Sequence, residues 1–580
     1  MALPNDGMTA DGSDFDWNVE RCRLAGLPGG GINIAHEAVD RHVAEGRGDR
    51  RALVSLGRRY ERRNVTYAEL ADASARVCGV LRELGVQPGD TVAVLLGRSV
   101  ELYQAALGIW KAGAVFCPLF GVFGPGPLRS RLELSRAKVL IASESLYTRK
   151  VLPVRGNMAD LRHVLLVADE ADADAGDHAG CDDFRTRLSA AQPAATAATA
   201  EDTPAFMHFT SGTTGTPKGA VHAHGAVVAH LATGQQVFGL KPDDVYWCTA
   251  DPGWITNTVY ALIVPLVNGC TAVVDEADFD PRRWYGVLKE EKVSVWYTTP
   301  TNIRMMMRYG AALARTYREN SLRLAASAGE PLNPEAVAWG DKALGAPFHD
   351  TWWQTETGAI AIANLAGEGK PGSMGRPLPG VQAAVVTRNL SKVEVVTDPE
   401  TVGELALRAD LPSLFTSYLG DVSRYQSCFV DGWYLTGDLV RRDADGFFWF
   451  VGRSDDMIKS AGHTIGPFEI ECALMEHPAV AEIGVVGKPD LLLREVPVAF
   501  VSLNPGFEEG EALRLELLYY ARQHLGSAIA PREIQFVDTM PKTTTGKILR
   551  RALKAKAVAE PDEDLALPPS SYPGRFADDE

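Results

Sequence analysis

The segment Thr210-Ser-Gly-Thr-Thr-Gly-Thr-Pro-Lys-Gly219 gives the strongest indication of the fold, and it directly follows the apolar run PAFMHF at residues 204–209. The apolar run is typical of a buried strand. In the loop after it, glycines let backbone N–H groups approach an anion, hydroxyl groups add donors and Lys218 adds positive charge. A flexible surface loop is the alternative, but this combination after a strand indicates phosphate binding. The predicted contacts are Thr210, Ser211, Gly212, Thr213, Thr214, Gly215 and Lys218.

Outward from this stretch, short apolar runs alternate with helix-like sequence. The runs at residues 91–96, 140–143 and 163–167 predict strands, and residues 100–112 predict a helix. Strands that alternate with helices favour an α/β fold with largely parallel sheets. Residues 168–202 break the alternation, because they are acidic and then alanine-rich, and we expect a solvated surface loop there.

The C-terminal part of the chain has an organisation of its own. Residues 451–466 carry charge and glycine with little periodicity, which predicts a linker. Beyond it, residues 483–487 and 498–503 predict strands, and a helix is indicated by the four-residue spacing of Leu513, Leu517, Ala521 and Leu525. We therefore predict an N-terminal domain at 1–454, a C-terminal domain at 455–559 and a disordered tail, rich in proline and acidic residues, at 560–580.

Charge and cysteine content exclude several classes of function. The formal net charge is −16, and an acidic surface repels a phosphate backbone, so no nucleic-acid partner is expected. The eight cysteines form no C-x-x-C pair, which argues against a zinc site and fits a reducing cytoplasm. The N-terminus has no signal-peptide pattern and no apolar run is long enough to span a bilayer, so no membrane partner is expected either.

Five further strings combine glycine, carboxylate, hydroxyl and basic residues in short loops. They are Gly329-Glu-Pro331, Asp350-Thr-Trp-Trp-Gln-Thr-Glu-Thr-Gly358, Tyr434-Leu-Thr-Gly-Asp438, Gly452-Arg-Ser-Asp-Asp456 and Pro541-Lys-Thr-Thr-Thr-Gly-Lys547. With loop 210–219, and in this order, they resemble the motifs of the adenylate-forming superfamily, which holds acyl-CoA synthetases, luciferases and peptide-synthetase adenylation domains. The forms of the first two strings are similar to those of acetyl-CoA synthetases in particular.

The resemblance implies a fold and a reaction. The fold would have a large N-terminal domain of sheets packed with helices and a small, mobile α+β C-terminal domain. The reaction would use ATP, Mg²⁺ and coenzyme A to activate a short carboxylate, acetate or propionate, in two steps. A carboxylate is a poor acyl donor, so attack on the α-phosphate first makes an acyl adenylate and releases pyrophosphate, and the CoA thiol then displaces AMP. The first step concentrates negative charge and needs cations and hydrogen-bond donors arranged in advance.

The resemblance also assigns roles to single residues. Lys547 is the catalytic cation beside the carboxylate and the α-phosphate, and Glu356 helps to hold Mg²⁺. Asp438 accepts the ribose hydroxyls, as a carboxylate can, and Arg453 is a second ribose contact. Asp455 occupies the hinge between the domains. The adenine and α-phosphate walls comprise Gly329, Glu330, Pro331, Asp350, Thr351, Trp352, Gln354 and Thr355.

A tryptophan sets the expected size of the acid. By the resemblance, Trp353 closes the acyl pocket and leaves room for little beyond a methyl group, although a core tryptophan without a substrate role is the alternative. Ile255, Thr256 and Ala328 fall at other pocket positions. Ala328 is smaller than the valine usual there and would leave room for propionate, with a preference of only about 1–3 kcal/mol per methylene.

The chain departs from the family pattern at several positions. Thr464 stands where an arginine that contacts phosphate is usual, the last loop reads TTTGK, and Asn257 replaces a glycine beside the acyl pocket. CoA recognition is the weakest assignment and rests on Gly462 and Arg522. A solvated helix arginine is an equal interpretation of Arg522.

Two other functions stay open on the sequence alone. One is an adenylating enzyme that acts on another acid or passes its acyl group to another acceptor, such as a carrier-protein thiol. The other is a nucleotide-binding protein without catalysis, suggested by Thr464. The family's regulation further suggests that a lysine acetyltransferase and a deacetylase act on Lys547.

Overall fold

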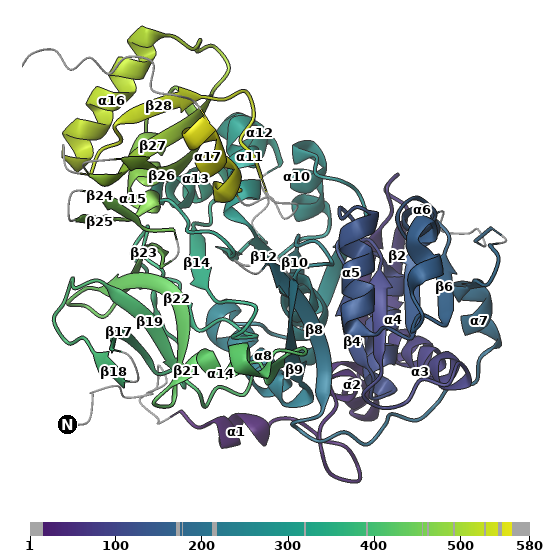
Figure 1. The fold of residues 1–580 in the computed structure, drawn as a ribbon. Helices are drawn as coiled ribbons and strands as arrows, with labels where there is room; N and C mark the ends of the chain where they lie inside the picture. The colour runs from purple at the N-terminus through teal and green to yellow at the C-terminus, as the bar shows by residue number, and fades with distance from the viewer. Residues whose placement is uncertain are drawn as a thin grey trace, which may run out of the picture. The chain divides into compact units, whose positions relative to one another are not determined.

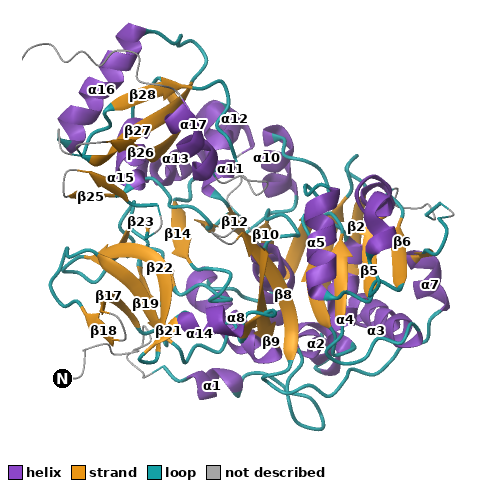
Figure 2. Cartoon of the chain, viewed as in Figure 1, coloured by secondary structure: helices purple, strands orange, loops and turns teal. Residues whose placement is uncertain are grey.

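The computed structural model describes residues 15–169, 175–176, 178–211, 217–317, 321–389, 392–454, 456–460, 463–490, 493–526, 529–542 and 548–559. The chain forms two compact units, Met1–Phe450 and Val451–Glu580, and each is described by itself. Helices and strands largely alternate through the first unit as far as β14 (Phe348–Trp352), after which several strands follow one another, and both kinds of element are coloured in Figure 2. The predicted tail at 560–580 lies outside the described residues.

The first sheet has eight strands in the order β20-β9-β8-β4-β3-β5-β6-β7. Strands β8, β4, β3, β5, β6 and β7 run parallel, whereas β9 and β20 are antiparallel additions. The strands predicted at 91–96, 140–143, 163–167 and 204–209 are confirmed. The bounds are β3 Thr91–Leu95, β4 Val115–Pro118, β5 Val139–Ser143, β6 His163–Val167, β7 Asp182–Asp183, β8 Pro204–Ser211, β9 Pro217–Ala223 and β20 Ser417–Tyr418.

Both faces of this sheet are covered, which explains its continuous apolar strands. Val92 and Val94 of β3 pack with α3 (Tyr67–Glu83) and α4 (Val100–Lys111), whereas Ala93 and Leu95 pack with α5 (Pro125–Ser135). Figure 1 labels these three helices beside β4 of the same sheet. Helix α4 begins where the Ser99 hydroxyl accepts a hydrogen bond from the Leu102 amide at 3.3 Å. The predicted helix at 100–112 is confirmed.

The second sheet has nine strands in the order β16-β15-β14-β13-β12-β10-β11-β1-β2, of which the six from β14 to β1 are parallel neighbours. One face packs on the large core shared with the first sheet, and the other on α10 (Pro281–Glu290), α11 (Pro300–Arg308), α12 (Gly310–Tyr317) and α13 (Pro334–Leu344). The bounds are β1 Arg51–Leu56, β2 Arg62–Thr66, β10 Val245–Cys248, β11 Thr271–Asp275, β12 Val295–Thr298, β13 Leu324–Ser327, β14 Phe348–Trp352, β15 Ile362–Ala363 and β16 Arg376–Pro377.

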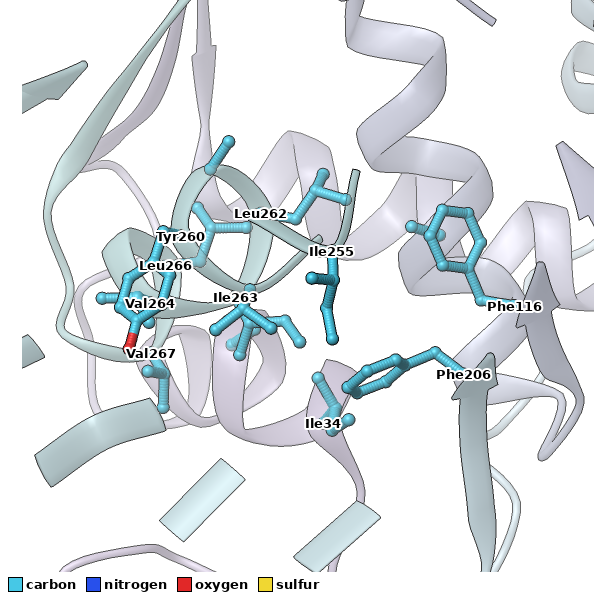
Figure 3. Close-up of a cluster of buried hydrophobic side chains, with 14 of the residues drawn as sticks. Ile34, Phe116, Phe206, Ile255, Tyr260, Leu262, Ile263, Val264, Leu266 and Val267 are labelled. Carbon is cyan, nitrogen blue, oxygen red and sulfur yellow. The ribbon is translucent and has the colours of Figure 1, made fainter. Parts of the chain in front are cut away.

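The shared core is formed by branched and aromatic side chains from segments far apart in the sequence. Phe116 of β4 and Phe206 of β8 are paired in register, and both lie with Ile34, Ile255 and the buried segment 260–267 (Figure 3). Burial of this apolar surface, at about 25 cal/mol per Å², is the main force that holds the two sheets together.

A third sheet departs from the prediction of largely parallel sheets. Its pairs β17–β18, β17–β19, β19–β22 and β21–β22 are antiparallel, and β23 joins β22. Short connections join β17 to β18 and β21 to β22, and a short hairpin connection can join only antiparallel neighbours, which is the physical reason for the difference at these two pairs. The bounds are β17 Ala383–Asn389, β18 Lys392–Val395, β19 Gly403–Arg408, β21 Phe429–Val430, β22 Trp433–Arg442 and β23 Phe448–Arg453.

The solvated loop predicted for residues 168–202 is wrong for much of that segment. Helix α7 (Phe184–Ala190) begins at Asp183, whose carboxylate accepts from the Thr186 amide at 2.6 Å, and it buries Phe184. The alanine-rich part then runs along α3 and α4, because small side chains allow close backbone contact. The Ala194 and Ala197 amides donate to the carbonyl oxygens of Ala75 and Lys111 at 2.9 and 2.7 Å.

The second unit is an α+β arrangement with a sheet in the order β25-β24-β27-β26, to which β28 adds beside β27. Within the predicted linker at 451–466, Ile458 and Ile465 are buried and paired across a hairpin, so the prediction is wrong there. Helix α16 buries Leu517 and Ala521, as its four-residue spacing predicts. The bounds are β24 Ile458–Ser460, β25 His463–Ile465, β26 Val480–Asp490, β27 Arg494–Leu503, β28 Glu533–Phe536, α15 Pro467–Met475, α16 Glu511–Leu525 and α17 Arg550–Ala559.

Each helix in the described ranges is too short or too polar to cross a lipid bilayer.

Candidate active site

The predicted phosphate-binding loop joins two paired strands. Thr210 at the end of β8 lies opposite Lys218 at the start of β9, and Ser211 lies opposite Pro217. Gly212, Thr213, Thr214 and Gly215 lie outside the described residues. The hairpin therefore fixes both ends of the loop and holds Lys218 beside Thr210.

A segment near residue 416 connects this hairpin to the motif that contains Glu356. The Thr416 and Leu419 amides donate to the carbonyl oxygens of Val221 and Gly219 on β9, both at 2.8 Å. Directly before Thr416, the Phe415 amide donates to the Glu356 carbonyl oxygen at 2.8 Å. Two motifs that the sequence separates are thus held together by a third segment, residues 415–419 around β20, which no predicted motif contains.

Tyr418 of β20 orients the Glu356 carboxylate. Its hydroxyl group donates to Glu356 Oε1 at 2.7 Å. Burial first, and then the adjacent carboxylate, raise the pKa of Tyr418, so the phenol keeps its proton. In the described ranges, no three His, Cys, Asp or Glu residues are grouped as ligands for a metal ion. A single oriented carboxylate fits Mg²⁺ that is bound mainly through the phosphates of a nucleotide and water.

Two buried histidines hold the turn that follows Glu356. His222 Nδ1 donates to the Ser413 carbonyl oxygen at 3.0 Å, and His230 Nε2 donates to the Gly358 carbonyl oxygen at 3.0 Å. Burial lowers the pKa of His222 to about 4 and of His230 to about 3, so both rings are neutral. Gly358 has a φ of +66°, and a Cβ there would lie 2.2 Å from the Ser413 carbonyl oxygen. The turn therefore requires glycine.

Asp350 anchors one wall of the candidate nucleotide site. Strands β13 and β14 are parallel, with Ser327 opposite Asp350, so the predicted strings after each strand lie at the same sheet edge. The Asp350 carboxylate accepts from the amides of Leu332 and Thr351 at 3.1 and 3.0 Å and from the Ser327 hydroxyl at 3.4 Å. Burial raises the pKa of Asp350 to about 7 even though these donors favour the ionised form.

The loop between β13 and α13 has a fixed shape. Gly329 has a φ of +96°, which favours glycine. Glu330 is paired with Arg304 on α11 and accepts from the Thr301 hydroxyl at 2.6 Å. Pro331 is half-buried beside it. Thus the Glu330 side chain is directed to α11, and the backbone of this loop is the part left to face a ligand.

Asp438 connects two predicted motifs. Its Oδ2 accepts from Trp352 Nε1 and from Gln354 Nε2, both at 2.9 Å. Gln354 also donates to the Thr436 carbonyl oxygen at 3.0 Å and accepts from the Tyr434 hydroxyl at 2.8 Å. The position of the Asp438 carboxylate is therefore set before any ligand binds. Thr355 is half-buried in the turn that follows Gln354.

Three of the predicted acyl-pocket residues, Trp353, Ile255 and Ala328, belong to the shared core or pack against it. Trp353 lies edge-on against Tyr260, with ring centroids 5.0 Å apart, and its Nε1 donates to the Tyr297 hydroxyl at 3.1 Å. Ile255 and Ala328 are buried in the same cluster, and Thr256 is half-buried. Asn257 is buried and donates to the Ala250 carbonyl oxygen at 3.0 Å.

The remaining predicted residues belong to the second unit. Arg453 ends β23, Arg522 is exposed on α16, and Thr464 lies on β25. Asp455, Gly462 and Lys547 lie outside the described residues.

Sequence reasoning missed the residues that hold the site together. They are Tyr418, Tyr434, Tyr297, Arg304, His222 and His230. Only Tyr434 carried a signal, as the first residue of the YLTGD string. The others lie in ordinary strands and helices, where nothing local distinguishes a supporting tyrosine or histidine from a core residue.

The chain is similar to known proteins over most of its length. The family of AMP-binding enzymes matches residues 40–419, and the C-terminal domain of AMP-binding enzymes matches residues 469–547. An acetyl-coenzyme A synthetase of Bacillus subtilis is 41% identical over 560 residues, which cover 95% of either chain.

Two solved structures are similar over most of the chain. An acyl-CoA synthetase of Brucella canis has a TM-score of 0.73 and 34% identity, covering 96% of this chain and 99% of that one. An anthranilate CoA ligase in complex with anthranoyl-AMP has a TM-score of 0.81 and 28% identity, covering 91% and 97%.

Proposed function

The chain belongs to the family of AMP-binding enzymes, and we propose that it joins acetate to coenzyme A in an ATP-dependent reaction that passes through acetyl adenylate. Pyrophosphate leaves in the first step and AMP in the second. ATP, Mg²⁺ and coenzyme A are the co-substrates, as in the acetyl-coenzyme A synthetases to which the chain is similar.

The observation that carries this proposal is the connected set of site residues in the first unit. Lys218 is held on the hairpin that flanks the phosphate loop, and β20 links the same hairpin to Glu356. Asp438 is fixed by Trp352 and Gln354 from the string that contains Glu356. A cation (Lys218), a carboxylate for the metal ion (Glu356) and a carboxylate that can accept hydrogen bonds from the ribose hydroxyls (Asp438) are thus in place before the nucleotide binds, as adenylation requires.

The two steps follow from these groups. In the first, a carboxylate oxygen of acetate attacks the α-phosphorus, and the bond from that phosphorus to the bridging oxygen breaks with release of pyrophosphate. In the second, the CoA sulfur attacks the carbonyl carbon, the bond to AMP breaks, and the thiol proton passes to solvent. Lys218 is proposed to offset charge on the phosphates, and Lys547 charge on the carboxylate and α-phosphate.

Glu356 is the residue proposed to hold Mg²⁺, which would neutralise phosphate charge when bound with ATP. Tyr418 keeps one carboxylate oxygen of Glu356 in a fixed direction through its 2.7 Å hydrogen bond. Asp438 is proposed to accept the ribose hydroxyls, and its hydrogen bonds from Trp352 and Gln354 keep it from rotating.

Trp353 supports the choice of a very short acid. Its indole ring is fixed by contacts on its edge and its nitrogen, and it borders the cluster that contains Ile255 and Ala328. We propose that these three side chains and Thr256 line the methyl pocket. Each extra methylene would have to displace a fixed side chain.

The second unit is proposed to bring Lys547 and the CoA contacts Gly462 and Arg522 to the reaction, with Asp455 as the hinge and Arg453 on the ribose side. The second unit is compact by itself and begins at Val451, which supports a domain boundary near Asp455. Two chemistries at one site require two arrangements of the catalytic groups, which a domain rotation would supply.

We place the reaction in the cytoplasm, because all eight cysteines are free thiols.

Acetylation of Lys547 by an acetyltransferase, reversed by a deacetylase, is proposed to regulate the enzyme. Protein with acetyl-lysine incorporated at position 547 is expected to lose acetate-dependent ATP–pyrophosphate exchange. Retention of full exchange would reject that regulation.

The proposal is tested by measuring acyl-CoA formation with ATP, Mg²⁺ and CoA across acetate, propionate, butyrate, hexanoate and benzoate. ATP–pyrophosphate exchange is measured in parallel. Acetate should give the highest kcat/KM in both assays. Exchange without thioester would instead indicate a different acceptor, preference for benzoate or hexanoate would refute the pocket assignment, and inactivity in both assays would indicate a nucleotide binder without catalysis.

A further inference from the structure

We infer that Tyr297 is a specificity-determining residue, because it fixes the indole of Trp353 through a directed chain of hydrogen bonds and thereby sets the longest acid that the pocket accepts. Tyr297 is a positioning residue, since it acts through Trp353. The inference rests on the proposed function and deepens it.

The direction of each hydrogen bond in this chain is fixed by chemistry. The Thr351 hydroxyl donates to the Ser327 carbonyl oxygen at 2.7 Å, because a carbonyl oxygen can only accept. Its one proton is therefore used, so the Tyr297 hydroxyl, 2.8 Å away, must donate to Thr351 Oγ1. The Tyr297 oxygen is then an acceptor toward Trp353 Nε1 at 3.1 Å.

Tyr297 cannot easily move away from this role. Its side chain has 0% exposure, and its ring packs against both Phe238 and Tyr260, with centroids 5.1 and 5.3 Å away. Its strand, β12, is paired on either side with β10 and β13. The phenol oxygen is thus a fixed acceptor from the middle of the second sheet.

The Trp353 ring contacts Tyr260 and donates a hydrogen bond to Tyr297, and the two contacts limit different motions of the ring. The edge-to-face contact with Tyr260 limits how deeply the ring lies in the cluster. The hydrogen bond to Tyr297 limits rotation of the ring about its own bonds, because the N–H must point to one oxygen. Among the described residues, no second acceptor of Trp353 Nε1 lies within hydrogen-bonding distance.

The substitution Tyr297→Phe removes this acceptor and leaves the aromatic packing in place. The indole N–H would then lack a partner, and the ring would gain rotational freedom to seek one. We expect the ratio of kcat/KM for butyrate to that for acetate to rise by about 10-fold or more, the size of effect expected when a pocket admits further methylenes.

Tyr246→Phe is the matched control. Tyr246 is also fully buried on the neighbouring strand β10 and also contacts Phe238, but its hydroxyl has no hydrogen-bond partner among the residues that the structure describes. Tyr246→Phe therefore removes one phenol oxygen from the same core, as Tyr297→Phe does. It is expected to leave the butyrate-to-acetate ratio unchanged.

A double-mutant cycle separates positioning from a general loss of packing. Trp353→Phe retains an aromatic ring but has no N–H, so adding Tyr297→Phe to it should leave the acid profile of Trp353→Phe unchanged. An equal shift in both backgrounds would overturn the inference, as would a wild-type butyrate-to-acetate ratio in folded Tyr297→Phe.

Thr351→Val is the second variant, used if Tyr297→Phe fails to fold. It removes the acceptor of the Tyr297 proton and should raise the same ratio. An unchanged ratio in Thr351→Val would overturn the inference. Wild-type protein that cannot use acetate would refute the proposed function instead.

Discussion

Acidification from pH 8 to pH 5 is expected to unfold the first unit, because it contains five buried neutral histidines. They are His42, His208, His222, His224 and His230, none more than 2% exposed. Burial lowers their pKa to about 4 for His222 and about 3 for the others. In the unfolded chain the pKa of histidine is about 6.5.

The sign and size of the effect follow from proton linkage. Below pH 6.5 the unfolded chain binds protons at these sites and the native protein does not, so stability falls as pH falls. The loss is about 1.4 kcal/mol per pH unit for each histidine, hence about 2 kcal/mol each by pH 5 and roughly 10 kcal/mol for all five. Asp350 acts in the opposite direction: its native pKa of about 7 lies above the unfolded value, which adds about 2.5 kcal/mol as pH falls.

The net loss, roughly 7.5 kcal/mol, is comparable with the whole stability of a typical domain. Burial also raises the pKa of Asp251 and Glu276, which reduces the loss further. The measurement is the thermal midpoint by near-ultraviolet circular dichroism at half-unit pH steps, with urea midpoints as a check.

Two variants sharpen this experiment. His230→Gln can keep the hydrogen bond to the Gly358 carbonyl oxygen but cannot titrate, so it should shift the acid transition to lower pH. His524→Gln changes an exposed ring on α16 and should leave the transition unchanged. A thermal midpoint that stays level from pH 8 to pH 5 would refute the reasoning.

Three further predictions concern the site. Trp353→Gly should shift preference toward longer acids, with butyrate gaining about 10-fold or more relative to acetate; an unchanged acid profile in the acyl-CoA assay would refute the pocket. Tyr418→Phe removes the hydrogen bond to Glu356 Oε1 and should raise the Mg²⁺ concentration needed for half-maximal ATP–pyrophosphate exchange while the KM for acetate stays constant. Asp350→Asn cannot accept from both the Leu332 and Thr351 amides, so it should lower the free energy of unfolding by about 1–3 kcal/mol and raise the KM for ATP. A wild-type urea midpoint would contradict this.

The parts of the site that the sequence predicted are short and local. The loop at 210–219, the string at 350–358 and Asp438 each carry their chemistry within a few neighbouring residues, so composition and order identify them. Strands such as β3 were predicted for the same reason, since a strand buried on both faces is a continuous apolar run.

The sequence misled where tertiary contacts overrode composition. Residues 191–200 have the alanine-rich composition of a solvated loop, but small side chains allow the backbone to lie against α3 and α4. Ile458 and Ile465 are too few to give a periodic signal, yet they pair across a hairpin and are buried.

By itself, the sequence determined the α/β fold, the family motifs and the residue types available for adenylation. Tertiary structure alone decided which partners hold those residues. Tyr418 lies 62 residues from Glu356, and Tyr297 lies 56 residues from Trp353. The physical reason is that a hydrogen bond needs its two atoms within about 3 Å. Sheet order and register set that distance, and they depend on pairings between strands that no local stretch of sequence encodes.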